Sequence, residues 1–302
     1  MTGTLVDVRR PASPPTANLA AAPQAVRFSW IMSTAAVWLI AAGCGVWWSF
    51  YVNNGVHGLD AHAYWSTAHR ANLYGPPPGS VDAYLYSPVF STVIRPIAIL
   101  PWHAFLGLWM AAETAAFVWL LKPLGVRWGV PAFFLCLIEV SVGNVYSFFA
   151  VVAVLGLRRP VAWALPLLTK MTPGLGPVWF AVRREWRSLA ISLAVTVAIA
   201  AVSVGLTPHQ WAQWLHFLAT NAGENQWYLP VRVIAAVALT VAGAVKGKPW
   251  VLAPAMLLAN PVIVNAWMGL TVLAAVPRLW LLSSERTDAV RVANTDTMGV
   301  TP

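Results

Sequence analysis

The feature that most constrains this chain is a set of long apolar runs without a single charged residue. Residues 28–51 carry no charge over 24 positions, and residues 188–206 carry none over 19. About 20 apolar residues are enough for a helix to cross a bilayer core of roughly 30 Å. Charged residues make up only 10% of the chain, against about 25% in an ordinary soluble domain. The sequence therefore predicts an all-α polytopic membrane protein.

The basic residues predict how the chain is oriented in the membrane. The net charge is +9, and the Lys and Arg residues form short clusters between apolar runs, which is typical of cytoplasmic loops. We therefore expect no nucleic-acid partner. Residues 1–27 contain three arginines, which place the N-terminus in the cytoplasm. Residues 52–87 contain two aspartates and one arginine, so we place that segment outside.

The same patterns divide the chain into three parts. Residues 1–27 and 283–302 have the composition of disordered cytoplasmic tails. Residues 28–282 form a single transmembrane domain, with outer loops at about 52–87 and 207–229. We expect about 8–10 membrane helices, several of them short or re-entrant.

Three helix breaks are predicted if the basic clusters all lie on the cytoplasmic side. These clusters are Arg158-Arg159, Arg183-Arg184-Arg187, Lys246-Lys248 and Arg278. Residues 160–182 then need two half-helices that enter and leave on one side, with the break at Pro173, which lacks a backbone donor. Similar breaks fall at Gly143-Asn144 and at Asn260-Pro261. Non-helical backbone at membrane depth must be buried in protein or line a wet cavity. The breaks therefore indicate one cavity open to the outside; the alternative is a set of plain kinked or short helices.

The first outer loop holds an acid, Asp60, with two open interpretations. As a structural residue, it caps a helix over residues 61–74, whose aromatic face lies on the membrane surface. As a functional residue, it is a general base that takes the proton of an acceptor hydroxyl. Three histidines, His57, His62 and His69, lie in the same loop, but their spacing fits no standard metal site. We expect no metal here and assign hydrogen bonding to sugar or phosphate instead.

Four ionisable residues fall within apolar stretches. A charge at the bilayer centre is costly, so such residues face a partner or a cavity. Lys170 lies at a predicted break, where a cation offsets the charge of a phosphate leaving group. Arg232 is a second candidate, with snorkelling to the interface as the alternative. Glu113 and Glu139 are expected to form buried ion pairs with these cations.

Several short motifs, in this order along the chain, resemble one known family. They are Leu59-Asp60, Tyr64-Trp65, Leu73-Tyr74, residues 84–88, Gly143-Asn144, residues 169–173, residues 183–187 and Asn260-Pro261. The pattern is similar to glycosyltransferase family 87, actinobacterial membrane enzymes of the GT-C fold, over roughly residues 28–282. Family members often carry a late element with two histidines. Residues 260–267 of this chain lack both.

The resemblance implies an inverting hexosyltransferase, mannosyltransferase-like, in the plasma membrane with its active site outside. The donor is a sugar on a polyprenyl phosphate, the acceptor is a glycolipid or cell-envelope glycan, and no cofactor is needed. Asp60 matches the catalytic base, and Lys170 matches a residue near the donor phosphate, with Arg232 as its helper.

The remaining candidates are residues for substrate binding, and the function itself has alternatives. The substrate-binding candidates are His57, His62, Tyr64, Tyr86, Asn144 and Trp227. Broken helices and a cavity also suit a transporter or flippase of a lipid-linked sugar. The missing late histidines suit a non-catalytic membrane scaffold derived from such an enzyme.

Overall fold

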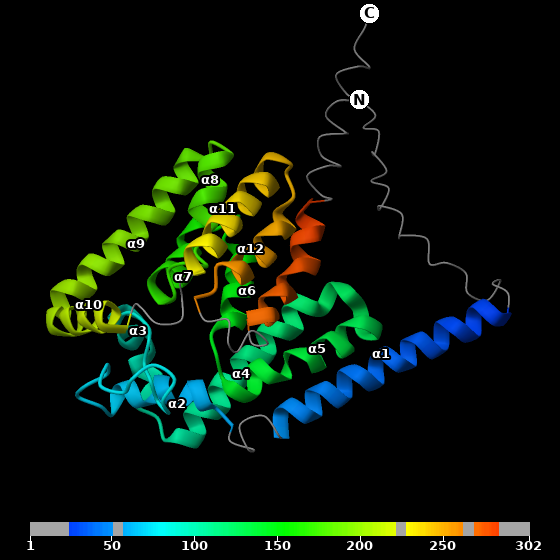
Figure 1. Cartoon of the computed structure of the whole chain (residues 1–302), viewed down its shortest axis with the longest axis horizontal. Coiled ribbons are helices and arrows are strands. Elements are labelled where there is room, and N and C mark those ends of the chain that lie inside the picture. The colour runs from blue at the N-terminus through cyan, green and yellow to red at the C-terminus, as the bar shows by residue number, and fades with distance from the viewer. Residues whose placement is uncertain (1–23, 51–56, 222–227, 262–268, 284–302) are drawn as a thin grey trace, which may run out of the picture.

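A computed structural model describes residues 24–50, 57–221, 228–261 and 269–283, and within these ranges the chain is helical with no strand. The α-helices are α1 (Gln24–Phe50), α2 (Leu59–Trp65), α3 (Pro88–Ala98), α4 (Trp102–Leu121), α5 (Gly125–Val142), α6 (Tyr146–Leu155), α7 (Ala164–Thr169), α8 (Gly176–Val182), α9 (Trp186–Leu206), α10 (Pro208–Asn221), α11 (Leu229–Val245) and α12 (Leu252–Leu258). Figure 1 shows them as one bundle, with α1 packed along α5 at one edge.

Three helical stretches in the described ranges are long and apolar enough to cross a membrane. They are Trp30–Trp47, Trp102–Val142 and Trp186–Leu206. Large apolar side chains on their outer faces are bare in the isolated chain, such as Leu39 at 74% exposed and Val197 at 65%. Lipid covers such surfaces in a membrane. The prediction of an all-α polytopic membrane protein is confirmed, whereas the division into tails and one domain stays a prediction.

Residues 88–121 form two helices rather than one. Pro88 begins α3, because proline suits the first helical turn, where its missing N–H is not needed. The chain then turns at Pro101 into α4. Helix α4 folds back onto α5 at a short 3-10 helix, Lys122–Leu124.

The predicted re-entrant pair over residues 160–182 is present as two half-helices. Helix α7 ends at Thr169 and α8 begins at Gly176. Gly176 packs against the Trp163 ring so closely that an added Cβ would lie 2.1 Å from it. Arg183, after α8, donates a hydrogen bond to the Ala244 carbonyl near the end of α11 (3.3 Å). The basic clusters that follow α8 and α11 thus share one end of the bundle (Figure 1); that this end faces the cytoplasm stays a prediction.

The helix expected over residues 61–74, with Asp60 as its cap, is wrong in both bounds and role. Helix α2 spans Leu59–Trp65, its N-cap is Gly58, and Asp60 is its second residue. The expected surface position of its aromatic face is also wrong, since Tyr64 is fully buried (0% exposed). The hydroxyl of Tyr64 pairs with that of Tyr86 at 2.8 Å, and its ring packs on Phe90. These contacts pull the loop into the protein instead of leaving it on the lipid.

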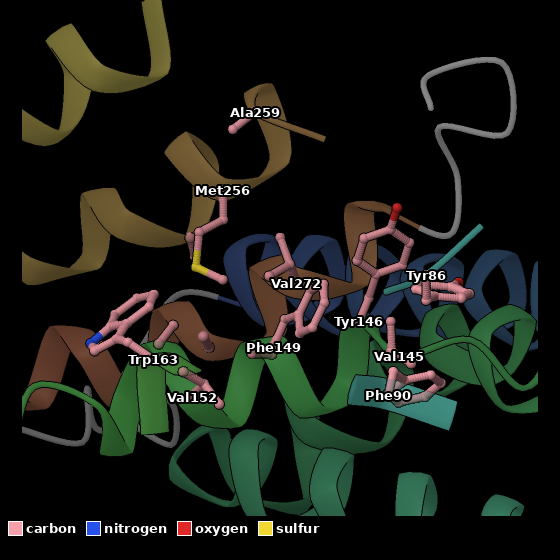
Figure 2. Packing of buried hydrophobic residues seen from close by; sticks show 14 of the residues in the cluster. Tyr86, Phe90, Val145, Tyr146, Phe149, Val152, Trp163, Met256, Ala259 and Val272 are labelled. Carbon is pink, nitrogen blue, oxygen red and sulfur yellow. The ribbon is translucent and has the colours of Figure 1, made fainter. Parts of the chain in front are cut away.

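The core is built around α6 and fixes the start of that helix. Phe149 and Val152 on α6 pack in one buried cluster with Met256 of α12 and with Val272. Figure 2 shows these side chains, with Tyr146 at the edge of the cluster. Because α6 is surrounded by apolar side chains, its first residues hold a fixed position at the α5–α6 break.

Candidate functional site

Asp60 is placed by a close contact between α2 and the α5–α6 break. The Gly58 amide donates to the Ser141 carbonyl at 2.7 Å. Gly143 has φ 76°, a left-handed conformation that glycine adopts without steric cost. A Cβ at Gly143 would lie 2.6 Å from the Ala61 Cβ. Only glycine therefore lets α2 approach the break closely enough to carry Asp60 to it.

Asn144 links Asp60 to Lys170. It is buried (4% exposed), and its Nδ2 donates a short hydrogen bond to Asp60 Oδ2. Its Oδ1 accepts from the Val145 amide at 2.7 Å and from Lys170 Nζ at 3.3 Å. Both partners of Oδ1 are donors and the partner of Nδ2 is an acceptor, so the hydrogen bonds define the orientation of the Asn144 amide. Asp60 and Lys170, both of which the structure describes, interact through this amide and form no direct ion pair.

Lys170 follows α7, at the break predicted from the sequence. Its Nζ donates to the Tyr146 hydroxyl at 2.8 Å and lies 4.0 Å from the centre of the Tyr146 ring. The Tyr86 ring centre is 5.4 Å away. An ammonium group has three donors, and Asn144 and Tyr146 are its two hydrogen-bond acceptors among the described residues. One N–H of Lys170 is thus available for a ligand.

The third break, at Asn260-Pro261, joins the same network. The Tyr146 hydroxyl donates to Asn260 Oδ1 at 2.5 Å. Arg232 donates to the backbone carbonyls of Asn260 (2.8 Å) and Pro261 (3.4 Å). The structure therefore brings all three predicted breaks to one polar cluster. Within it, Arg232 holds the backbone of the third break and is connected to Lys170 through Asn260 and Tyr146.

Two buried glutamates lie behind this cluster, and the ion pairs expected for them are wrong in the described part of the chain. Glu139 on α5 accepts the Tyr146 backbone N–H at 2.7 Å, which places a carboxylate at the N-terminal end of α6, where it is favoured by the helix dipole. Neither oxygen of Glu113 has a hydrogen-bond partner among the described residues. Neither cation pairs with these glutamates in the described part of the chain, because Lys170 bonds to Asn144 and Tyr146, and Arg232 bonds to backbone carbonyls.

The environment of Asp60 reverses the expected effect on its acidity. A capping role predicted a lowered pKa, but Asp60 is inside α2 and is not its cap. Burial raises the pKa of Asp60 above its ordinary value, while the Lys170 charge and the Asn144 hydrogen bond oppose this rise. Desolvation disfavours the charged carboxylate, so Asp60 is a better proton acceptor than a surface aspartate.

The other sequence candidates divide into near and distant residues. Tyr86 faces Lys170, and the hydroxyl of Tyr64 pairs with that of Tyr86. His62 points away, because its Nδ1 pairs with Asp82 at 2.5 Å. His57 is exposed and lies beside the Phe50 ring, with 6.4 Å between ring centres. Trp227 lies outside the described residues, as does most of the stretch where family members carry their late histidines.

Sequence reasoning missed two side chains of the cluster, those of Tyr146 and Asn260. Tyr146 comes two residues after Asn144, at the first position of α6. A polar residue at the start of the helix that follows a break is the signal that could have found it. For a metal, the described residues contain no suitable group of three His, Cys, Asp or Glu side chains, and a reaction without metal stays a prediction.

The fold and this cluster define a membrane-embedded protein whose broken helices gather an acid, an amide and an amine. The model of glycosyltransferase family 87 matches residues 84–300, more than two thirds of the chain. The chain belongs to this family and is a glycosyltransferase. No curated protein matches it, and no solved structure does. The family match begins after Asp60, so the case for Asp60 rests on its geometry.

Proposed function

We propose that this glycosyltransferase moves a hexose from a polyprenyl-phosphate carrier to a glycolipid or cell-envelope glycan, and that the hexose is mannose. The transfer takes place on the outer face of the plasma membrane. The observation that supports the proposal most directly is the connection of Asp60 to Lys170 through Asn144. It sets a proton acceptor and a phosphate-binding cation beside one another without letting them neutralise each other in a direct pair.

Lys170 is the residue for the donor phosphate. Its available N–H can bind a phosphate oxygen, and a charge-assisted hydrogen bond of this kind is about twice as strong as a neutral one. Arg232 supports the site by holding Asn260, whose side chain accepts from Tyr146. In this proposal Arg232 positions the cluster instead of binding the phosphate itself.

An apolar groove supports the assignment of a lipid-linked donor. A cavity of about 290 Å³ lies between α3 and α9, and apolar side chains dominate its lining, among them Val89, Val93 and Val202. Ser87, directly before α3, donates to the carbonyl of Leu168, two residues before Lys170. In this proposal a polyprenyl chain in the groove lies beside α3, and the Ser87 contact connects the start of α3 to the segment that carries Lys170.

The reaction is one displacement at the anomeric carbon. An acceptor oxygen forms a bond to that carbon as the bond from carbon to phosphate oxygen breaks, and the electron pair leaves with the phosphate. The acceptor proton passes to Asp60, and Lys170 offsets the charge on the departing phosphate. Since attack comes from the side opposite the phosphate, the configuration inverts. General-base catalysis of this kind contributes about 10²–10⁴-fold.

Substrate contacts follow from what surrounds these two groups. Asn144 and Tyr86 border Lys170 and are assigned to the transferred sugar and its phosphate. His62 is excluded from this set because Asp82 occupies its ring nitrogen. His57 and Trp227 stay assigned to the acceptor side of the outer loops.

The experiment that tests the proposal is transfer in a defined system. Purified protein is incubated with radiolabelled polyprenyl-phosphate-mannose and a membrane lipid extract, and products are separated by charge and size. We expect a new labelled product that resists mild acid, which releases sugar from the phosphate carrier. Label that stays on the carrier would contradict the proposal, and movement of the intact carrier across a vesicle bilayer would then favour a flippase.

A further inference from the structure

A second pocket lies apart from Asp60 and Lys170, between the first outer loop and α10. It is a surface cavity of about 420 Å³, within the range of about 300–1,000 Å³ typical of small-molecule sites. One wall is formed by residues of the segment 72–77, and the other by residues of α10. The lining includes Asn72, Tyr74, Gln213, His216 and Phe217.

The chemistry of this lining is polar, uncharged and aromatic. Among the described residues, no Asp, Glu, Lys or Arg contributes to the lining. The side chains of Asn72, Gln213 and His216 have no hydrogen-bond partner within the described ranges, so their donors and acceptors are open to a ligand. Each amide offers two donors and one acceptor group close together, a set that matches neighbouring hydroxyls on a sugar ring.

Two aromatic rings form the apolar part of the pocket. Tyr74 and Phe217 have ring centres 5.8 Å apart and are largely buried. Both rings line the pocket with the small part of their surface that stays exposed, so a ligand with an apolar patch and a hydroxyl-bearing edge, as a pyranose has, suits the site. A fully apolar ligand would leave the amides unpaired, which costs affinity, and an anion would find no basic residue in the described lining.

The pocket is connected to the proposed catalytic site through one tyrosine. The Tyr74 hydroxyl donates to the Tyr86 carbonyl at 2.9 Å, and the Tyr86 ring lies 5.4 Å from Lys170 Nζ. The two sites thus lie on opposite sides of the Tyr74–Tyr86 contact. A ligand that occupies both must be longer than one sugar.

We propose that this pocket binds an uncharged sugar residue of the acceptor, remote from the hydroxyl that attacks the donor. That the sugar belongs to an acceptor rests on the proposed function, whereas the affinity of the pocket for a neutral saccharide does not. The site would make the protein favour an acceptor of at least two sugars over a monosaccharide. The glycan can be free or can belong to a glycolipid headgroup, since both offer the same chemistry.

The test is direct binding of neutral saccharides to full-length protein. Protein is purified in a detergent without a sugar headgroup, so that the detergent does not compete, and mannose to mannotetraose are titrated with saturation-transfer NMR as readout. Wild type should bind the tri- and tetrasaccharide at least tenfold more tightly than mannose. The double variant Asn72→Ala/Gln213→Ala should lose at least tenfold in affinity for them, and His216→Ala should lose part of it.

The controls separate this inference from the proposed function. His209→Ala changes an exposed residue of α10 outside the pocket and should bind as wild type. Binding that is lost in the double variant supports the pocket even if wild type shows no transfer, in which case only the proposed function fails. No measurable binding by wild type, or equal binding by wild type and the double variant, would overturn the inference. In nanodiscs, tighter binding of a mannosyl lipid, lost in the same variant, identifies a lipid headgroup as the source.

Discussion

Asp60 on α2 and Lys170 after α7 are joined through a single side chain, the buried amide of Asn144. Its nitrogen donates to the carboxylate and its oxygen accepts from the ammonium. In a direct ion pair, the carboxylate and the ammonium would occupy each other's hydrogen-bonding groups, and a substrate would have to displace that bond. The amide keeps them apart, so that each retains hydrogen-bonding capacity while the pair stays nearly neutral inside the protein.

Asp60→Asn should lower transfer by about 10²–10⁴-fold, because an amide cannot accept the acceptor proton. The free energy of unfolding of Asp60→Asn should not be lower than that of wild type. Burial raises the pKa of Asp60, so the folded state favours the protonated form and ionisation at neutral pH costs stability. The amide removes that cost, and the thermal midpoint should stay or rise.

The matched control for this variant is Asp82→Asn in the same loop. Asp82 pairs with His62 and Arg70, away from Lys170, and its φ of 61° suits asparagine. Transfer by Asp82→Asn should stay within a few-fold of wild type. Near-normal transfer by Asp60→Asn would show that Asp60 has only a structural role.

The pH profile should report Asp60. Because its pKa is raised, kcat/KM should fall on the acid side at a pH above the usual aspartate value of about 3.9. The Lys170 charge lowers this pKa, so Lys170→Met should move the acid limb of kcat/KM to still higher pH. An acid limb at the same position in both proteins would contradict the coupling of the two groups.

Lys170→Met should weaken donor binding by about 1.5–3 kcal/mol, the loss expected for a charged hydrogen bond. That corresponds to roughly a 10- to 150-fold rise in Kd, measured by titration with the polyprenyl-phosphate sugar. Lys246→Met, an exposed lysine after α11, is the control and should bind as wild type. Unchanged donor affinity in Lys170→Met would remove Lys170 from the site.

Gly143→Ala should destabilise the protein and abolish transfer together. An alanine there pays about 1–2 kcal/mol for its left-handed conformation and also meets Ala61. Gly107→Ala on α4 has open space around its Cβ and should stabilise by about 0.5–1 kcal/mol. Chemical unfolding in mixed micelles measures both; a Gly143→Ala protein as stable as wild type would contradict the contact.

Membrane sidedness is predicted by the charge clusters and can be measured by labelling. In a variant lacking Cys44 and Cys136, a cysteine at Arg184 should react with an impermeant maleimide only after the cells are opened. A cysteine at Ser80 in the exposed outer loop should react in intact cells. Labelling of position 184 in intact cells would reverse the proposed orientation.

Local sequence chemistry was enough to predict the class of the protein and the places where its helices break. Uncharged runs must be helical in lipid, since no water is there to satisfy the backbone. Gly143, in a left-handed conformation, follows the last residue of α5, and Pro173, which lacks a backbone N–H, lies in the segment between α7 and α8. Asn144 and Lys170 were found because polar residues at such breaks are costly unless they are used, whereas Asp60 was found as an acid in the first outer loop.

Tertiary structure decided what these residues meet. Whether Asp60 caps a helix or faces a lysine depends on the packing of α2 against Gly143, a contact between distant segments that no local pattern encodes. The same holds for Tyr146 and Asn260, which become partners only when α6 and α12 pack in one core. It also holds for the acidity of Asp60, because burial and the charge of Lys170 are properties of the folded chain. Sequence determined which residues are exceptional in a membrane, and long-range packing determined which of them form a site.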